Sequence, residues 1–318
     1  MKTKSFLFAP IVALMLTSCG QTGVHHAEAE YIAGSLQYHD NFKILQLTDT
    51  HLGDKDDLDV HFNFMDSVIK EAGADMIVVT GDVFTFASKR TVVSFCEFME
   101  RYGLPWTVTW GNHDEQCFFS IDWLTGYLNG FGRHCLFKDL QDDDVTGNSN
   151  FVINLMDGSN LFEQLIVMDS NRYCFDGYFG YDCFKQDQID WYARVVNPTV
   201  KSMMFYHIPL PEIDLAYNYG IESHQIEGVK KETTCPPKRN SGMFAKIKEI
   251  GSTNAMFFGH DHINDFHIEY EGVIFSYGLK STNRVYFDED MTGGQVITLK
   301  NDHSVEINRI VKKYSEVK

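Results

Sequence analysis

Short apolar runs alternate with segments of helical periodicity along the first third of the chain. Residues 42–47, 76–80 and 106–110 are mainly apolar, which predicts three buried strands. Between them, apolar residues recur at helical spacing over 58–69 and 92–99, and a glycine follows each segment. This β-α-β-α-β order predicts right-handed crossovers and a mainly parallel sheet.

The rest of the chain repeats these two patterns. It adds one helix, around 189–196, and short apolar runs that predict strands at 151–155, 161–168, 203–206 and 255–258. Two later runs, 273–277 and 296–299, are expected to be strands of a second sheet. The predicted fold class is therefore α/β, with two mixed β-sheets packed face to face and flanking helices, in four layers.

The amino terminus predicts a secreted lipoprotein. Residues 1–18 combine early lysines, a short apolar core and small residues, which is typical of a signal peptide, and the apolar core is too short to span a bilayer. Leu16-Thr17-Ser18-Cys19 resembles a bacterial lipobox, which implies cleavage before Cys19 and a lipid on its thiol. Gly20 then resembles lipoproteins of the outer membrane, so we expect a lipid-anchored protein of the cell envelope that faces the periplasm. An ordinary cleaved signal is the alternative.

Two further segments lack the pattern of regular elements. Residues 19–40 are small and polar, which predicts a flexible, lipid-attached tether before one domain over 41–318. Residues 208–242 are long, polar and turn-rich, and they follow His207 directly. Loops of that length are usually functional or disordered, so we expect a lid or rim insertion there.

Charge and cysteines narrow the class of protein. The formal net charge is −17, which would repel a polyanion and argues against a nucleic-acid-binding module. Apart from Cys19, the cysteines form no CxxC pair, so neither a zinc ribbon nor a thioredoxin-type site is predicted. Their even number permits disulfides in an oxidising compartment, in a pairing that the sequence does not show. No obligate protein partner is indicated.

Potential metal ligands stand at the ends of five of the predicted strands. They form the blocks Asp49-Thr50-His51, Gly81-Asp82, Gly111-Asn112-His113-Asp114, His207 and Gly259-His260-Asp261-His262. Residues so far apart in sequence can converge only if these strands lie side by side. Their oxygen and nitrogen donors suit Mn, Fe or Zn and exclude a thiolate zinc site. The pattern predicts a hydrolytic site with two metal ions.

The order of these blocks resembles that of the calcineurin-like metallophosphoesterases over residues 42–283. Segments 188–191 and 207–212 most resemble the Dcr2-like phosphatase branch. The resemblance implies the four-layer αββα metallophosphoesterase fold. It also implies two metal sites that share Asp82, with ligands Asp49, His51, Asp82 and His262 for the first and Asp82, Asn112, His207 and His260 for the second. His113 would lie beside the leaving-group oxygen, and Asp114 would orient His113.

One departure separates the chain from the purple acid phosphatases. Those enzymes carry a tyrosine three residues after the aspartate of the second block, where this chain has Thr85, and their first block lacks the histidine that is His51 here. We therefore expect no tyrosinate–iron charge transfer.

The expected function is hydrolysis of a small-molecule phosphoester by a hydroxide that two metal ions share and that attacks phosphorus in line. A phosphomonoesterase is favoured, and a phosphodiesterase on the same site is the alternative. An inactive binding protein on this fold is a weaker alternative, because every expected ligand is present. A metallopeptidase is disfavoured because the chain has no HExxH helix. Asn171 and Arg172, after the strand over 161–168, are candidate phosphate contacts.

Overall fold

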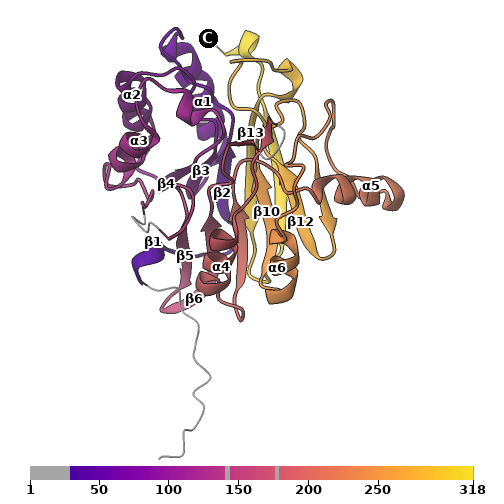
Figure 1. Ribbon diagram of the computed structural model, residues 1–318. Coiled ribbons are helices and arrows are strands. Elements are labelled where there is room, and N and C mark those ends of the chain that lie inside the picture. Colours follow the sequence, from indigo (N-terminus) through magenta and orange to yellow (C-terminus); the bar gives the residue numbers. More distant parts are fainter. Residues whose placement is uncertain (1–28, 140–143, 176–178, 318) are drawn as a thin grey trace, which may run out of the picture.

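The computed structural model describes residues 29–139, 144–175 and 179–317 (Figure 1). The predictions for residues 1–18 and for Cys19 lie outside these ranges and stay predictions. Within the described residues no helix is long and apolar enough to cross a membrane, and all six cysteines are free thiols.

A five-stranded sheet contains the predicted β-α-β-α-β unit. Its strand order is β14 (Val305–Val311), β13 (Gly293–Leu299), β2 (Phe42–Leu47), β3 (Met76–Thr80) and β4 (Trp106–Thr109). The pairs β2–β3 and β3–β4 are parallel, while β13 is antiparallel to both of its neighbours. The predicted parallel start of the fold is confirmed.

A seven-stranded sheet packs against the first. Its order is β1 (Ile32–Gln37), β5 (Phe151–Asp157), β6 (Asn160–Val167), β9 (Lys201–Phe205), β10 (Thr253–Phe258), β12 (Val273–Tyr277) and β11 (His267–Tyr270). The central strands β6, β9, β10 and β12 are parallel, and β5 and β11 pair antiparallel with them. Both sheets are therefore mixed, as predicted.

Helices cover the outer faces of both sheets (Figure 1). Those on the five-stranded sheet are α1 (Leu58–Ala72), α2 (Lys89–Glu100) and α3 (Ile121–Leu128). Those on the seven-stranded sheet are α4 (Gln186–Val195) and α6 (Met243–Ile250), while α5 (Ile213–Ser223) packs against β11 at its edge. Short 3-10 helices lie at Ala29–Tyr31, Asp114–Gln116, Glu289–Met291 and Tyr314–Glu316.

Alternate residues of the central strands pack in two different hydrophobic cores. Phe205 and Phe257 stack at 5.2 Å in the core between the sheets, whereas Met204 and Met256 point to the core under α4 and α6. Because both faces of these strands are buried, their sequences are continuously apolar rather than alternating. This is why the strands that end at the site were recognisable from the sequence.

Two predictions about the sheets and the tether need correction. The runs 273–277 and 296–299 do not share a sheet: β12 pairs with β10, while β13 pairs with β2. A short apolar run predicts a strand but does not show which other strand it will pair with. Residues 29–40 are also not a tether, because β1 pairs with β5 and Tyr31 is buried. Backbone pairing at a sheet edge gives this strand hydrogen bonds that a polar sequence does not reveal.

Candidate metal centre

The expected ligands lie at the carboxyl ends of parallel strands from both sheets. Asp49 and His51 follow β2, Asp82 follows β3, and Asn112 follows β4. From the other sheet, His207 follows β9, and His260 and His262 follow β10. Carboxyl ends of parallel strands are where open α/β sheets usually form their sites.

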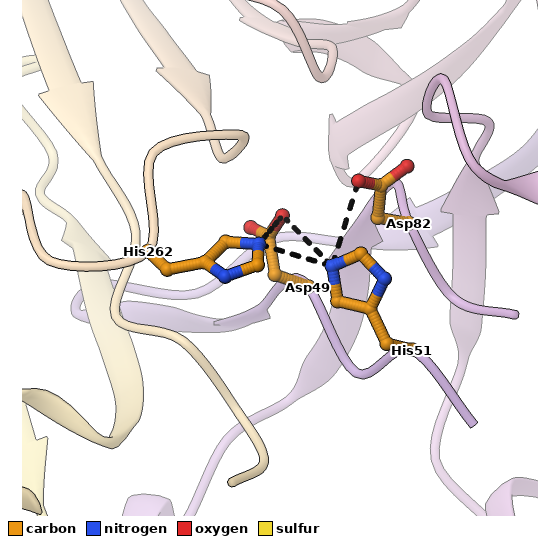
Figure 2. Close-up of side chains that lie close together, drawn as sticks. All are labelled: Asp49, His51, Asp82 and His262. Atoms are coloured by element: carbon orange, nitrogen blue, oxygen red, sulfur yellow. Dashed lines mark hydrogen bonds and ion pairs between the residues drawn. The ribbon is translucent and has the colours of Figure 1, made fainter. Parts of the chain in front are cut away.

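The first group contains Asp49, His51, Asp82 and His262, whose donor atoms all lie within 4.8 Å of one another (Figure 2). The Nε2 atoms of His51 and His262 are 3.0 Å apart. Asp49 Oδ1 lies 3.5 Å from His262 Nε2, and Asp82 Oδ2 lies 3.6 Å from His51 Nε2. All four side chains are buried and point toward one common centre.

The second group shares Asp82 with the first. Donor atoms of Asp82, His207 and His260 also lie within 4.8 Å of one another, and His207 Nε2 is 3.2 Å from Asp82 Oδ2. The same carboxylate oxygen therefore faces a histidine of each group. The sequence predicted this shared aspartate, and the structure brings the two groups together around it.

Unpaired buried atoms mark where cations would fit. Among the described residues, four predicted ligand atoms are buried without a hydrogen-bond partner: Asp49 Oδ1, Asn112 Oδ1, His207 Nε2 and His260 Nε2. Leaving one such atom unpaired costs about 1–3 kcal/mol. Three of these atoms belong to residues of the two groups above, and oxygen and nitrogen ligand atoms of this kind fit a pair of metal ions.

In several ligands, one side-chain atom is held by a neighbouring residue while the other side-chain atom faces the centre. His207 Nδ1 donates to Thr80 O at 2.8 Å, and His262 Nδ1 donates to Tyr286 O at 2.9 Å. When such a ring is neutral, its proton is held on Nδ1, and Nε2 carries the lone pair that a metal needs. Asp49 Oδ2 likewise accepts from the Thr48 hydroxyl at 2.7 Å.

Burial and neighbouring charges shift the pKa values of several ligands at the centre. Burial would raise the pKa of Asp82, but His207, His51 and His113 together outweigh burial and hold that pKa well below its usual range. Burial lowers the pKa of His260 to about 3. For His207 burial acts the same way, yet the Asp82 carboxylate raises its pKa to about 10. A cation at His207 Nε2 would therefore have to displace a proton.

Strained backbone accompanies these ligands. Asp49, His51, Asp82 and His260 all have positive φ, between 47° and 82°, a region that costs non-glycine residues energy. Gly81, before Asp82, also has a positive φ, of 82°, and it has a second reason to lack a side chain: a Cβ there would lie 2.5 Å from the His207 ring. The Gly-Asp block is thus needed for the close approach of two strand ends from different sheets.

His113 lies beside the first group, but Asp114 does not orient its ring as predicted. Its ring centroid is 5.1 Å from that of His51, and its Nδ1 lies 2.8 Å from Gln116 Oε1. Asp114 instead accepts backbone N–H groups of Phe84 and Gly111 at 2.8 and 2.7 Å. Asp114 therefore fixes the loop, and Gln116 orients the His113 ring. Sequence position alone could not separate these roles, because both residues lie within three positions of His113.

Asn171 and Arg172 are not placed as the sequence suggested. Asn171 Nδ2 donates to Cys183 O at 3.0 Å and to Gln188 Oε1 at 2.8 Å, so its amide joins a loop to α4. This is a structural role, which corrects the predicted phosphate contact. Arg172 forms an ion pair with Glu115, next to the loop of His113. Its contact with phosphate stays a prediction.

Several contacts around the centre were missed by the sequence analysis. Lys280 is buried, and its Nζ donates to Asp49 O at 2.7 Å. Thr85 Oγ1 lies 2.8 Å from His51 Nδ1, at the position where purple acid phosphatases carry tyrosine. The Tyr173 hydroxyl accepts from Asn112 Nδ2 at 2.8 Å. The one signal that the sequence offered for these contacts was a charged residue just after an apolar run, and this signal applied to Lys280.

The predicted insertion over 208–242 also reaches this region. Its first half forms α5, and residues 234–238 line a cavity together with Tyr173 and Tyr181. These residues lie at the rim of the site, while closure as a lid stays a prediction.

Comparison with known proteins decides the family. The model of the calcineurin-like phosphoesterase family matches residues 42–264. The chain belongs to this family. The match covers every predicted ligand and ends just after His262.

Two curated relatives are called phosphatases in their names. The chain is 28% identical to "Probable inactive purple acid phosphatase 14" of Arabidopsis thaliana over 321 residues, which covers 86% of this chain and 78% of that protein. It is 27% identical to "Phosphatase DCR2" of Saccharomyces cerevisiae over 261 residues, or 71% of this chain but 44% of that longer protein.

Solved structures show the same fold. A dimetal phosphatase from Danio rerio matches with a TM-score of 0.59 at 13% identity and covers 86% of this chain and 100% of that one. The protein GAP50 of Plasmodium, called the anchor in the inner membrane complex, matches with a TM-score of 0.52 at 12% identity, over 88% and 87% of the two chains. At these identities the likeness supports the α/β architecture alone.

Proposed function

We propose that this protein is a metal-dependent hydrolase of phosphoesters and that its substrate is a small phosphomonoester. The observation that carries the proposal is the pair of buried ligand groups that share Asp82 Oδ2. A phosphodiester is the alternative substrate, because the same ligands would serve both.

The residues of the chain suit two neighbouring cations. Asp49, His51, Asp82 and His262 would hold one, and Asp82, Asn112, His207 and His260 the other. Two bound cations would supply positive charge to a phosphoryl oxygen and would lower the pKa of a water molecule. The donor set suits Mn, Fe or Zn.

His113 is the group that would serve the leaving oxygen. Gln116 Oε1 can only accept, so Nδ1 of His113 carries a proton. Nε2 can then donate only when the ring is doubly protonated. In that state His113 would stabilise the departing oxygen electrostatically and supply its proton. The His113 backbone N–H donates to Asp82 Oδ1 at 2.8 Å, which holds the backbone of His113 next to the shared ligand.

The names of the plant relatives raise a second candidate, an inactive binding protein. Against it, the full ligand set and His113 are all present here, and four ligand atoms are buried without partners among the described residues. Metal bound at the centre with no turnover on a broad panel of phosphoesters would favour this second candidate.

The test is hydrolysis of p-nitrophenyl phosphate and of its bis ester with Mn(II). We expect Asp82→Ala to lower kcat/KM more than about 100-fold, since losing even an outer partner of a metal ligand costs up to that much. The control is Asp59→Ala, which removes an exposed carboxylate on α1 and should leave the rate unchanged. Equal rates for the wild type and Asp82→Ala would exclude the mechanism.

A further inference from the structure

A cavity of about 640 Å³ lies beside the metal centre, and the catalytic residues do not account for it. One wall is the hairpin of β7 (Tyr173–Phe175) and β8 (Phe179–Tyr181). Other lining residues come from the segment after His207, and they include Pro211, Cys235, Pro236 and Pro237. Two sequence segments without a role in metal binding thus enclose one space.

This cavity adjoins the second ligand group. The Tyr173 hydroxyl accepts from Asn112 Nδ2 at 2.8 Å. The Tyr181 ring meets the His260 ring edge to face, with centroids 4.3 Å apart. Both wall residues therefore contact a predicted ligand directly. A phosphoester whose phosphoryl group lies at the centre has its organic group within reach of this space.

Aromatic rings dominate the hairpin wall. The Tyr173 ring stacks on those of Phe179 and Tyr181, with centroids 5.1 and 5.6 Å apart. Phe179 nevertheless leaves 68% of its surface exposed. Such a ring, together with the prolines of the same lining, offers flat apolar surface to a ligand.

The charged lining residues favour an uncharged ligand. The lining contains one acid, Asp214, and one base, Lys238. The Asp214 carboxylate already accepts from the Thr234 hydroxyl. The cavity therefore has no excess of either sign, in contrast to the acidic chain as a whole.

We propose that this cavity binds the organic group of the substrate and selects a flat, uncharged aromatic group. The inference rests on the proposed phosphoesterase function and names the substrate class of the same site. Phe179 and Tyr173 would stack on the ring of the substrate, and Pro236 and Pro237 would cover its other face. An aliphatic ester would fill the same space without stacking and would bind more weakly.

The experiment compares 2-naphthylmethyl phosphate with n-butyl phosphate. Both release an alkoxide of similar basicity, so intrinsic reactivity does not decide between them. We expect the wild type to prefer the aromatic ester in kcat/KM by about 10-fold or more, and Phe179→Ala to reduce this preference by about 3- to 10-fold, the range for one aromatic pair.

The matched control is Phe175→Ala. Phe175 lies opposite Phe179 in the same hairpin and is 80% exposed, but it is not part of the cavity lining. Its loss should leave the preference unchanged. Equal losses in the two variants would mean that hairpin order, and not stacking, is measured, and would overturn the inference.

The outcomes for the cavity and for the function are separable. Equal kcat/KM for the two esters in the wild type would overturn the inference and leave the phosphoesterase function standing. If neither ester is hydrolysed, the proposed function fails in this test. Calorimetry with 2-naphthylmethylphosphonate and n-butylphosphonate then decides on the cavity. Tighter binding of the aromatic phosphonate supports the inference, and equal binding overturns it.

Discussion

Several of the predicted ligands at the centre have a neighbour that fixes their orientation. Asp49 accepts from Thr48, His207 donates to Thr80, and Asn112 donates to Tyr173. In every case one atom is held and another is left unpaired at the centre. Such partners keep ligands in place before a metal binds and raise affinity.

Tyr173→Phe tests one of these partners. Without the hydroxyl, the Asn112 amide can rotate away, so its oxygen is no longer held toward the second site. We expect the Mn(II) concentration for half-maximal activity to rise about 10-fold, with activity recovered at high Mn(II).

The control for this substitution is Tyr181→Phe. Tyr181 lies directly opposite Tyr173 in the hairpin, and its ring contacts His260. The same chemical change there should leave the Mn(II) dependence as it is in the wild type. Superimposable Mn(II) titrations for Tyr173→Phe and the wild type would refute the orienting role.

The ligands were predictable from the sequence, and their partners were not. Each ligand block follows an apolar run, which is a local signal. By contrast, the contact of Asn112 with Tyr173 spans 61 positions, and that of Asp49 with Lys280 spans 231. Only the folded chain brings such pairs together. The predicted role of Asp114 failed for the same reason, since its contacts are with backbone groups that the sequence does not locate.

Among the strands, burial on both faces decided what the sequence revealed. The central strands β2, β3, β9 and β10 are almost wholly buried, so continuous apolar runs marked them. The edge strand β1 has no buried residue in its pattern, and its membership depends on backbone pairing. Tertiary contacts also decide which sheet β12 joins and which sheet β13 joins. Gln295 of β13, for example, contacts Gln46 at 2.9 Å and Ser276 at 3.0 Å.

Strand β6 contains a buried acid, Glu163, whose ionisation should affect stability. Its side chain is inaccessible, Oε2 contacts His303 Nδ1 at 2.7 Å, and Oε1 has no partner among the described residues. Burial raises the pKa of Glu163 to about 7 from 4.5, with His303 opposing. A raised carboxyl pKa stabilises the fold below pH 4.5 and loses that contribution as the pH rises to about 7.

Glu163→Gln should therefore stabilise the protein at alkaline pH. At pH 8 we expect the variant to gain about 1–3 kcal/mol in free energy of unfolding, since it keeps the shape without the buried charge. The gain should shrink as the pH falls below the raised pKa of Glu163 and vanish near its ordinary value. Urea unfolding across this pH range checks it, and a difference independent of pH would contradict the assignment.

At the scale of the whole molecule, the two sheets together form the site. The five-stranded sheet supplies Asp49, His51, Asp82 and Asn112, and the seven-stranded sheet supplies the other three ligands. The predicted four-layer architecture explains this, because strands that pack face to face bring their carboxyl ends to one place. The buried carboxylates and the unpaired ligand atoms from both sheets then require positive charge between them.

Anomalous diffraction from crystals grown with Mn(II) tests this claim most directly. We predict two peaks per chain, both in contact with the Asp82 carboxylate. One would lie against Asp49, His51 and His262, and the other against Asn112, His207 and His260. A single peak, or peaks that do not share Asp82, at saturating Mn(II) would contradict the account.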